Sequence, residues 1–212
     1  ATDARGVFPE SHPRWAGVLS GIYNPNTIEM EILNRADAVV LVGMDAMMTQ
    51  NPWPFSLPTC ELAARAEYET LTTPKVRVNG DLGDALRGLT RESQADFPTT
   101  PERSFATASG EADIRAAHEK MLLHFKRPRE ARLAAQDVIQ VCRRLLPSEG
   151  LLFTETGAFI LMLETLWPVE RPGTYFGTSG GRTMGLMVPA ILGAALARPD
   201  LPMIGIGADG SL

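Results

Sequence analysis

The sequence predicts an α/β protein made of two incomplete three-layer α/β domains with mainly parallel sheets. Three features indicate this fold: a helix pattern followed by a continuous apolar run at 38–43, further strand and helix patterns after position 150, and glycine-rich loops where predicted strands end. The chain of 212 residues is 44% hydrophobic and 21% charged, which is ordinary for a globular protein.

The first 90 residues predict part of an α/β domain. Asn26 and Glu29 have the spacing of a helix-capping box. One apolar face follows, made of Ile28, Ile32, Leu33 and Ala36. The next run, 38–43, is apolar and β-branched and predicts a strand buried on both faces. Residues 60–70 fit either a helix or a strand.

A short strand at Lys75–Val78 and a helix at Asp81–Leu89, begun by Asp81, complete this part. Thr, Ser, Pro, Glu and Ala then dominate from Thr90 to Ser109, as is typical of a linker. An amphipathic helix follows, with an apolar face of Ile114, Ala117, Met121, Leu122 and Phe125. We therefore predict a domain at 1–90 and a linker with a helix at 91–128.

Residues 129–212 predict the second domain. A helix at 130–146 would carry Ala134, Val138, Val141, Cys142 and Leu145 on one apolar face. Strands are predicted at 151–154 and 202–206. Between them we expect a helix ending near Trp167, and a glycine-rich loop at 177–185 leading into a buried helix with Pro189 in its first turn. Because a parallel strand needs covering neighbours, we expect this domain to be truncated at the loop 207–211.

Composition excludes several classes of partner. A net charge of −5 gives no reason to expect nucleic acid, and no apolar stretch is long enough to span a bilayer. Cys60 and Cys142 lack paired spacing, so neither a disulfide framework nor a zinc site is expected. We predict a cytoplasmic protein. His118 and His124 are expected to face solvent on or beside the amphipathic helix.

The glycines at 205, 207 and 210 match the G-x-G-x-x-G pattern of dinucleotide sites. Asp209 lies inside that turn, where its carboxylate would repel a pyrophosphate. If Asp209 instead holds Mg²⁺, the ion can bridge the carboxylate to phosphate oxygens. A solvated aspartate in an ordinary turn is the simpler alternative.

Two segments resemble known proteins in the same order along the chain. The first runs from Gly6-Val-Phe-Pro-Glu-Ser-His-Pro13 to Leu41-Val-Gly43 and Val78-Asn-Gly-Asp81. The second is Ser179-Gly-Gly-Arg-Thr-Met-Gly185 followed by the apolar helix, Pro202–Gly207 and Ala208-Asp-Gly-Ser211. Together they resemble the thiamine-diphosphate-dependent superfamily of acetolactate synthases and 2-oxo acid decarboxylases. They are similar to part of its central domain and to the start of its cofactor domain.

The resemblance implies a role for particular residues. Asp209 would bind Mg²⁺, with Gly210 and Ser211 beside the diphosphate. Met184 would support the cofactor's two rings, and the carbonyl of Arg182 would accept a hydrogen bond from its pyrimidine. Three residues would line the diphosphate loop: Thr156, Gly157 and Ala158. Ala208 stands where the family has the first glycine of its Gly-Asp-Gly motif.

The implied cofactors are thiamine diphosphate and Mg²⁺, and the implied reaction is C–C bond cleavage or formation on a 2-oxo acid or aldehyde, by a carboligase or a decarboxylase. The resemblance also implies a homodimer or homotetramer, and no catalytic residue in this segment, so the segment by itself is expected to be inactive. FAD or ADP binding is not predicted. Two alternatives remain open: an NAD-binding oxidoreductase using Gly205, Gly207 and Gly210, and a non-catalytic scaffold of the same fold.

Overall fold

The computed structural model describes residues 4–21, 23, 27–46, 51–94, 107–125, 133–177 and 183–211. The elements follow in the order α1 (Ile28–Leu33), β1 (Val39–Val42), β2 (Thr59–Ala63), β3 (Val76–Asn79), α2 (Leu82–Gln94), α3 (Thr107–His124), α4 (Ala135–Leu145), β4 (Leu151–Thr154), α5 (Ile160–Leu166), β5 (Tyr175–Phe176), α6 (Met187–Ala197), β6 (Met203–Ile206) and the short 3₁₀ helix η4 (Asp209–Ser211).

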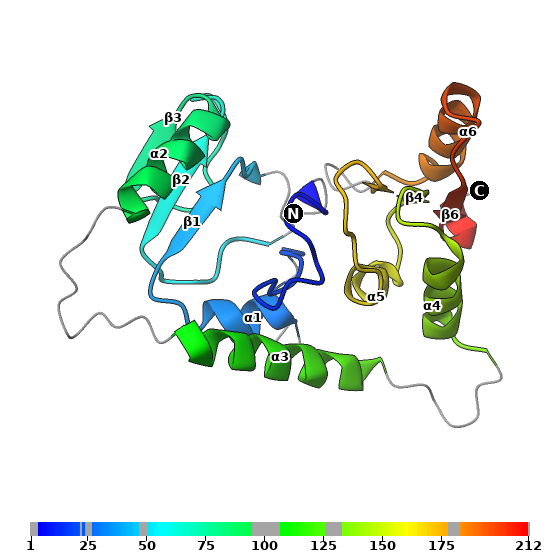
Figure 1. Cartoon of the computed structure of the whole chain (residues 1–212), viewed down its shortest axis with the longest axis horizontal. Helices are drawn as coiled ribbons and strands as arrows, with labels where there is room; N and C mark the ends of the chain where they lie inside the picture. Colours follow the sequence, from blue (N-terminus) through cyan, green and yellow to red (C-terminus); the bar gives the residue numbers. More distant parts are fainter. Residues whose placement is uncertain are drawn as a thin grey trace.

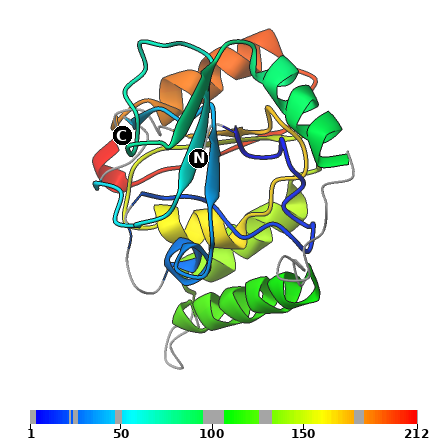
Figure 2. The same ribbon diagram turned by 90° about the vertical axis from the view of Figure 1, so that its left-hand side faces the viewer.

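Two parallel sheets form the framework, so the predicted α/β class is confirmed. One sheet has the order β1-β2-β3 and the other β5-β4-β6. Figure 1 shows them in two regions side by side, with the N-terminal segment between them. In the view of Figure 2, α3 lies below α1. The ion pair Lys120–Glu31 joins the two helices, and Arg35, just after α1, pairs with Asp113 of α3; both distances are 2.8 Å. No helix among the described residues is long and apolar enough to cross a bilayer.

The first sheet is covered less than predicted. Residue pairs Val40–Cys60 and Val42–Leu62 are in register, and Leu41 on the opposite face of β1 is buried. However, Val40 is 53% exposed and Val42 is also exposed, so the prediction of a strand buried on both faces is wrong. The ambiguous stretch 60–70 begins with β2, and β3 occupies the predicted position.

Two predicted caps have different outcomes. Asn26 lies outside the described residues, and α1 begins at Ile28 after Thr27, whose side chain makes no capping hydrogen bond. The Glu29 carboxylate instead accepts hydrogen bonds from the Ser20 amide and hydroxyl, at 2.5 and 2.7 Å, and fastens the preceding loop. Asp81, by contrast, caps α2 as predicted, because its Oδ1 accepts from the Asp84 amide at 2.8 Å.

The predicted linker is partly helical. α2 continues past position 90 to Gln94, and α3 begins at Thr107, before the predicted end of the linker. α3 packs through Ala117 and Met121 against Ile28 of α1, and Leu161 of α5 also reaches this cluster. His118 does not face solvent freely: it is half-buried, and its ring stacks on Trp15 with centroids 5.4 Å apart.

The second region has three layers, with the sheet between helices on both faces. On one face, Leu151 and Phe153 pack against Met187 of α6; on the other, Leu152 packs with Ile139 of α4 and Leu163 of α5. All four residues of β4 are buried, because this central strand has helices on both sides. β5, which the sequence analysis did not identify, pairs with β4 at Leu152–Tyr175 and Phe153–Phe176.

Two predictions about helix faces are wrong. α4 points Ile139 and its C-cap residue Leu146 inward, whereas Leu145, on the predicted face, is 74% exposed. Val138 and Val141 are also exposed. The predicted buried helix, α6, has an open outer side, where Leu192 and Leu196 are exposed. Each helix carries apolar residues beyond a single stripe, so periodicity alone did not identify the inner face.

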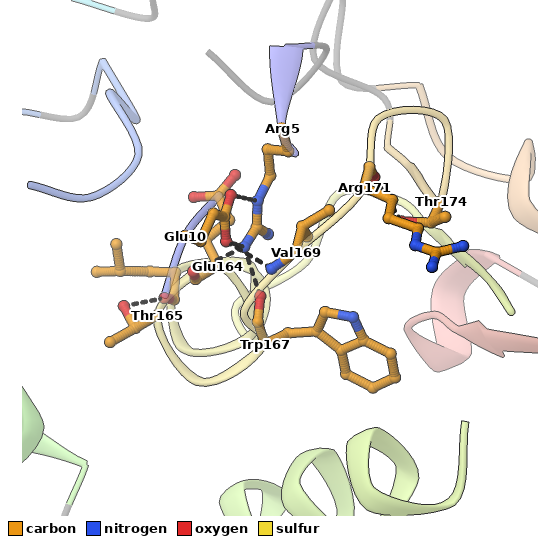
Figure 3. Close-up of polar contacts among 9 residues, drawn as sticks. Arg5, Glu10, Glu164, Thr165, Trp167, Val169, Arg171 and Thr174 are labelled. Atoms are coloured by element: carbon orange, nitrogen blue, oxygen red, sulfur yellow. Dashed lines mark hydrogen bonds and ion pairs between the residues drawn. The ribbon is translucent and has the colours of Figure 1, made fainter. Parts of the chain in front are cut away.

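A buried ion pair joins the N-terminal segment to the second region. Figure 3 shows Arg5 paired with Glu10, with Nε–Oε1 and Nη2–Oε2 distances of 2.8 and 2.6 Å. Arg5 also donates to the carbonyl of Trp167, and Glu10 accepts from the Val169 amide at 2.8 Å. The Arg5 guanidinium lies 4.2 Å from the centre of the Tyr175 ring. Burial raises the pKa of the Tyr175 hydroxyl far above its usual value, against the lowering effect of Arg5.

Candidate cofactor site

The predicted site residues come from loops at one edge of the second sheet. β4, β5 and β6 are parallel, so the segments that follow them leave at the same edge. Gly157 follows β4 and Ala208 follows β6; a Cβ atom on Gly157 would lie 3.5 Å from the Ala208 Cβ. Gly177 follows β5, and its Cβ position is 3.5 Å from Thr154 Cγ2. The three exits are therefore neighbours in space.

Met184 and Gly210 also lie together. A Cβ on Gly210 would stand 3.2 Å from the Met184 Cε, so the methionine tip lies over this glycine. Met184 is otherwise 55% exposed, which leaves much of its side chain open to a bound group. The structure thus brings together Met184, before α6, and the loop after β6, which the family resemblance assigned to the same cofactor.

Asp209 opens η4 and is exposed. Its carboxylate makes no hydrogen bond or ion pair with the described part of the chain. Among those residues no three His, Cys, Asp or Glu side chains gather as a complete metal site. Mg²⁺ commonly takes only one or two protein carboxylates and fills its shell with phosphate and water oxygens, so a single exposed aspartate is compatible with that ion.

The other residues predicted to bind the cofactor differ in how deeply they are buried. Thr156 and Gly157 are half-buried and Ala158 is exposed. Ser211 lies in η4, whereas Arg182 lies outside the described residues. Thr154 adds a polar atom that the sequence analysis missed: its Oγ1 is buried at the end of β4 and has no hydrogen-bond partner among the residues that the structure describes. An unpaired hydroxyl and closely approaching glycines fit a site for a polar, phosphorylated group.

The glycines of the dinucleotide pattern have packing roles here. Gly205 lies within β6 rather than in a turn, and a Cβ there would come within 2.5 Å of Met187 Sδ. A Cβ on Gly207 would come within 2.6 Å of Met187 Cε. A larger residue at either position would force the Met187 side chain to shift, so both glycines let α6 pack closely here, and the pattern needs no dinucleotide to explain it.

Comparison with known proteins tests the resemblance in this region. Residues 155–212 match the family described as the C-terminal TPP binding domain of thiamine pyrophosphate enzymes. The match includes Met184 and Asp209. The resemblance to thiamine-diphosphate-dependent enzymes is therefore confirmed. The predicted cofactor, thiamine diphosphate with Mg²⁺, is the cofactor that this family uses.

Similar proteins extend the match over the whole chain. Acetolactate synthase isozyme 1 large subunit of Escherichia coli is 25% identical over 99% of this chain and 36% of its own length. Sulfoacetaldehyde acetyltransferase of Alcaligenes xylosoxydans xylosoxydans is 25% identical over 97% of this chain and 38% of its own length. The chain thus spans little more than a third of these relatives.

The fold is shared with a solved structure. An X-ray structure described as a thiamin diphosphate-dependent enzyme from Mycobacterium smegmatis superposes with a TM-score of 0.68. It is 22% identical in sequence, and the match covers 98% of this chain and 38% of that chain. The arrangement of the two parallel sheets therefore matches that of a larger protein.

Proposed function

We propose that the protein containing this chain catalyses C–C bond cleavage or formation on 2-oxo acids or aldehydes with thiamine diphosphate and Mg²⁺. Three features that lie together at one edge of the second sheet support this proposal most. They are the exposed Asp209, the Met184–Gly210 contact and the loop at Gly157. They lie within the residues that match the TPP-binding domain. When bound, thiamine diphosphate supplies an electron sink for the carbon chemistry.

The chain's own residues would bind and orient that cofactor. Asp209 would contribute one oxygen ligand to Mg²⁺, and the amides of Gly210 and Ser211 would lie beside the diphosphate. Thr156, Gly157 and Ala158 would line the other side of the diphosphate. Met184 would support the cofactor's rings, and the Arg182 carbonyl would accept a hydrogen bond from the pyrimidine. No catalytic residue is assigned to this segment.

The relatives' names include a synthase, an acetyltransferase and a probable pyruvate decarboxylase, so carboligation and decarboxylation are both compatible with the family. We retain the division into 1–90, 91–128 and 129–212 as a proposal, together with a homodimer or homotetramer and a cytoplasmic location. That the isolated segment is inactive also stays a prediction.

Replacement of the proposed metal ligand tests the function. In the full-length protein, Asp209→Ala should abolish magnesium-dependent binding of thiamine diphosphate, measured by isothermal titration calorimetry with and without Mg²⁺. Asp200→Ala is the matched control, because Asp200 is an exposed aspartate near β6 that pairs with Arg198 at 2.8 Å. The control should bind as the wild type does.

Unchanged affinity in Asp209→Ala would refute the metal assignment. A folded wild-type protein that binds no thiamine diphosphate would favour the scaffold alternative. Binding of NAD instead, lost on Gly210→Val, would favour the oxidoreductase.

A further inference from the structure

Glu155 is a buried carboxylate beside the candidate site that has no role in the proposed function. It follows β4 directly, and only 1% of its surface is exposed. A buried carboxylate is costly unless hydrogen-bond donors surround it. Its neighbours therefore indicate what it holds in place.

The Glu155 carboxylate binds the beginning of α6. Its Oε2 accepts hydrogen bonds from the Leu186 and Met187 amides at 3.1 and 3.2 Å. The first amides of a helix have no partner within the helix, and the positive end of the helix dipole favours a negative charge there. Gly185, with a φ of +77°, turns the chain immediately before these amides. The position of Met184 is thus tied to Glu155 through two residues of backbone.

The same carboxylate lies against the segment that leads to Asp209. A Cβ on Gly207 would stand 2.9 Å from Glu155 Oε1, so this carboxylate oxygen fills the space beside the glycine. Farther along each segment, Met184 Cε meets Gly210. Glu155 therefore lies between the bases of two loops whose tips touch at the candidate site.

We propose that Glu155 is a positioning residue that fixes the position of the Met184 side chain relative to the loop at Gly210. This inference rests on the proposed function. It goes further by separating two halves of cofactor binding. The diphosphate half depends on Asp209 and its loop, whereas the ring half depends on Met184, which Glu155 holds through α6.

Two ligands separate these halves experimentally. Thiamine diphosphate and inorganic diphosphate, each with Mg²⁺, are titrated calorimetrically into the full-length protein and its Glu155→Gln variant. Hydrogen-bond partners of metal ligands, which are likewise one step removed from the bound group, are typically worth about 10–100-fold in metal affinity or activity. We expect thiamine diphosphate affinity to fall about tenfold, at the low end of that range, because glutamine keeps one acceptor oxygen. Affinity for inorganic diphosphate should stay unchanged, because glutamine has nearly the same size as glutamate and keeps the contact beside Gly207.

A helix cap in the other region provides the control. Asp81 caps α2 through a 2.8 Å hydrogen bond from the Asp84 amide, so Asp81→Asn makes the same carboxylate-to-amide change away from the site. Both variants should lower the thermal unfolding midpoint, but only Glu155→Gln should weaken thiamine diphosphate binding. A merely structural cap would not produce that selectivity.

Several results would overturn the proposal. Equal weakening of both ligands, or no weakening of either, would show that Glu155 does not position Met184. If Glu155→Gln does not fold, Glu155→Asp replaces it, since aspartate keeps the charge but is one methylene shorter; it too must lose thiamine diphosphate affinity selectively. If the wild type binds neither ligand, the proposed function itself fails, which is a distinct outcome.

Discussion

The two parallel sheets are covered to different extents. In the sheet β5-β4-β6, Leu152 is fully buried, since α4 and α5 lie on one face and α6 on the other. In the sheet β1-β2-β3, one face leaves Val40, Val42, Val76 and Val78 exposed, although the central strand β2 is largely buried. Parallel strands are thus covered on both faces in the second region but are only partly covered in the first.

The opposite face of the first sheet is also packed less closely. A cavity of about 170 Å³ lies between residues 16–19, α1, Val39, Leu41 and Trp53. In the second region, helices and glycine contacts fix the loops that carry the proposed cofactor residues. Precise binding requires rigid supports, so the candidate site lies where both faces of the sheet are covered.

The largest expected effect comes from breaking the link between the N-terminal segment and the second region. Arg5→Met would leave Glu10 buried without its charge partner, and such changes cost about 3–5 kcal/mol. Chemical denaturation would measure the loss of unfolding free energy. Arg198→Met removes an exposed partner of Asp200 and should give no measurable change. A small loss of unfolding free energy in Arg5→Met would show that the attachment of the N-terminal segment to the second region does not depend on this ion pair.

A somewhat smaller effect tests the two cores directly. Leu152→Ala should lower the unfolding free energy by about 2–5 kcal/mol, because the side chain is fully enclosed. Val40→Ala, in the first sheet, removes a side chain that is 53% exposed and should cost about 1 kcal/mol or less. If the two losses measured by urea unfolding were equal, Val40 would have to be covered in solution.

Glycine replacements give the finest comparison. Gly205→Ala would place its Cβ 2.5 Å from Met187 Sδ, and overpacking of this kind costs about 1–3 kcal/mol. At Gly88 in α2 nothing lies within 4 Å of the added Cβ, so Gly88→Ala should stabilise that helix by about 0.5–1 kcal/mol. Opposite shifts in melting temperature are expected. A neutral Gly205→Ala would mean that the Met187 side chain can move aside.

Local patterns were enough to place most of the secondary structure. The β-branched run gave β1, the apolar run at 151–154 gave β4, and Asp81 was identified as the cap of α2. β5 was missed because it has only two residues and pairs solely with a central strand. The inner face of α4 was misjudged because Ile139 and Val138 are both apolar, and only packing against Leu152 and Leu163 distinguishes them.

By itself, the sequence determined the α/β class, the parallel strands of both regions and the resemblance to thiamine-diphosphate-dependent enzymes, because these depend on local periodicity and on motifs that are contiguous in the chain. Only the tertiary structure decided that the valines of the first sheet are exposed and that Met184 meets Gly210. The role of Glu155 likewise appeared only in three dimensions, since its hydrogen-bond donors lie 31 and 32 residues away. Burial and long-range contacts depend on which elements cover one another, and no local pattern encodes that.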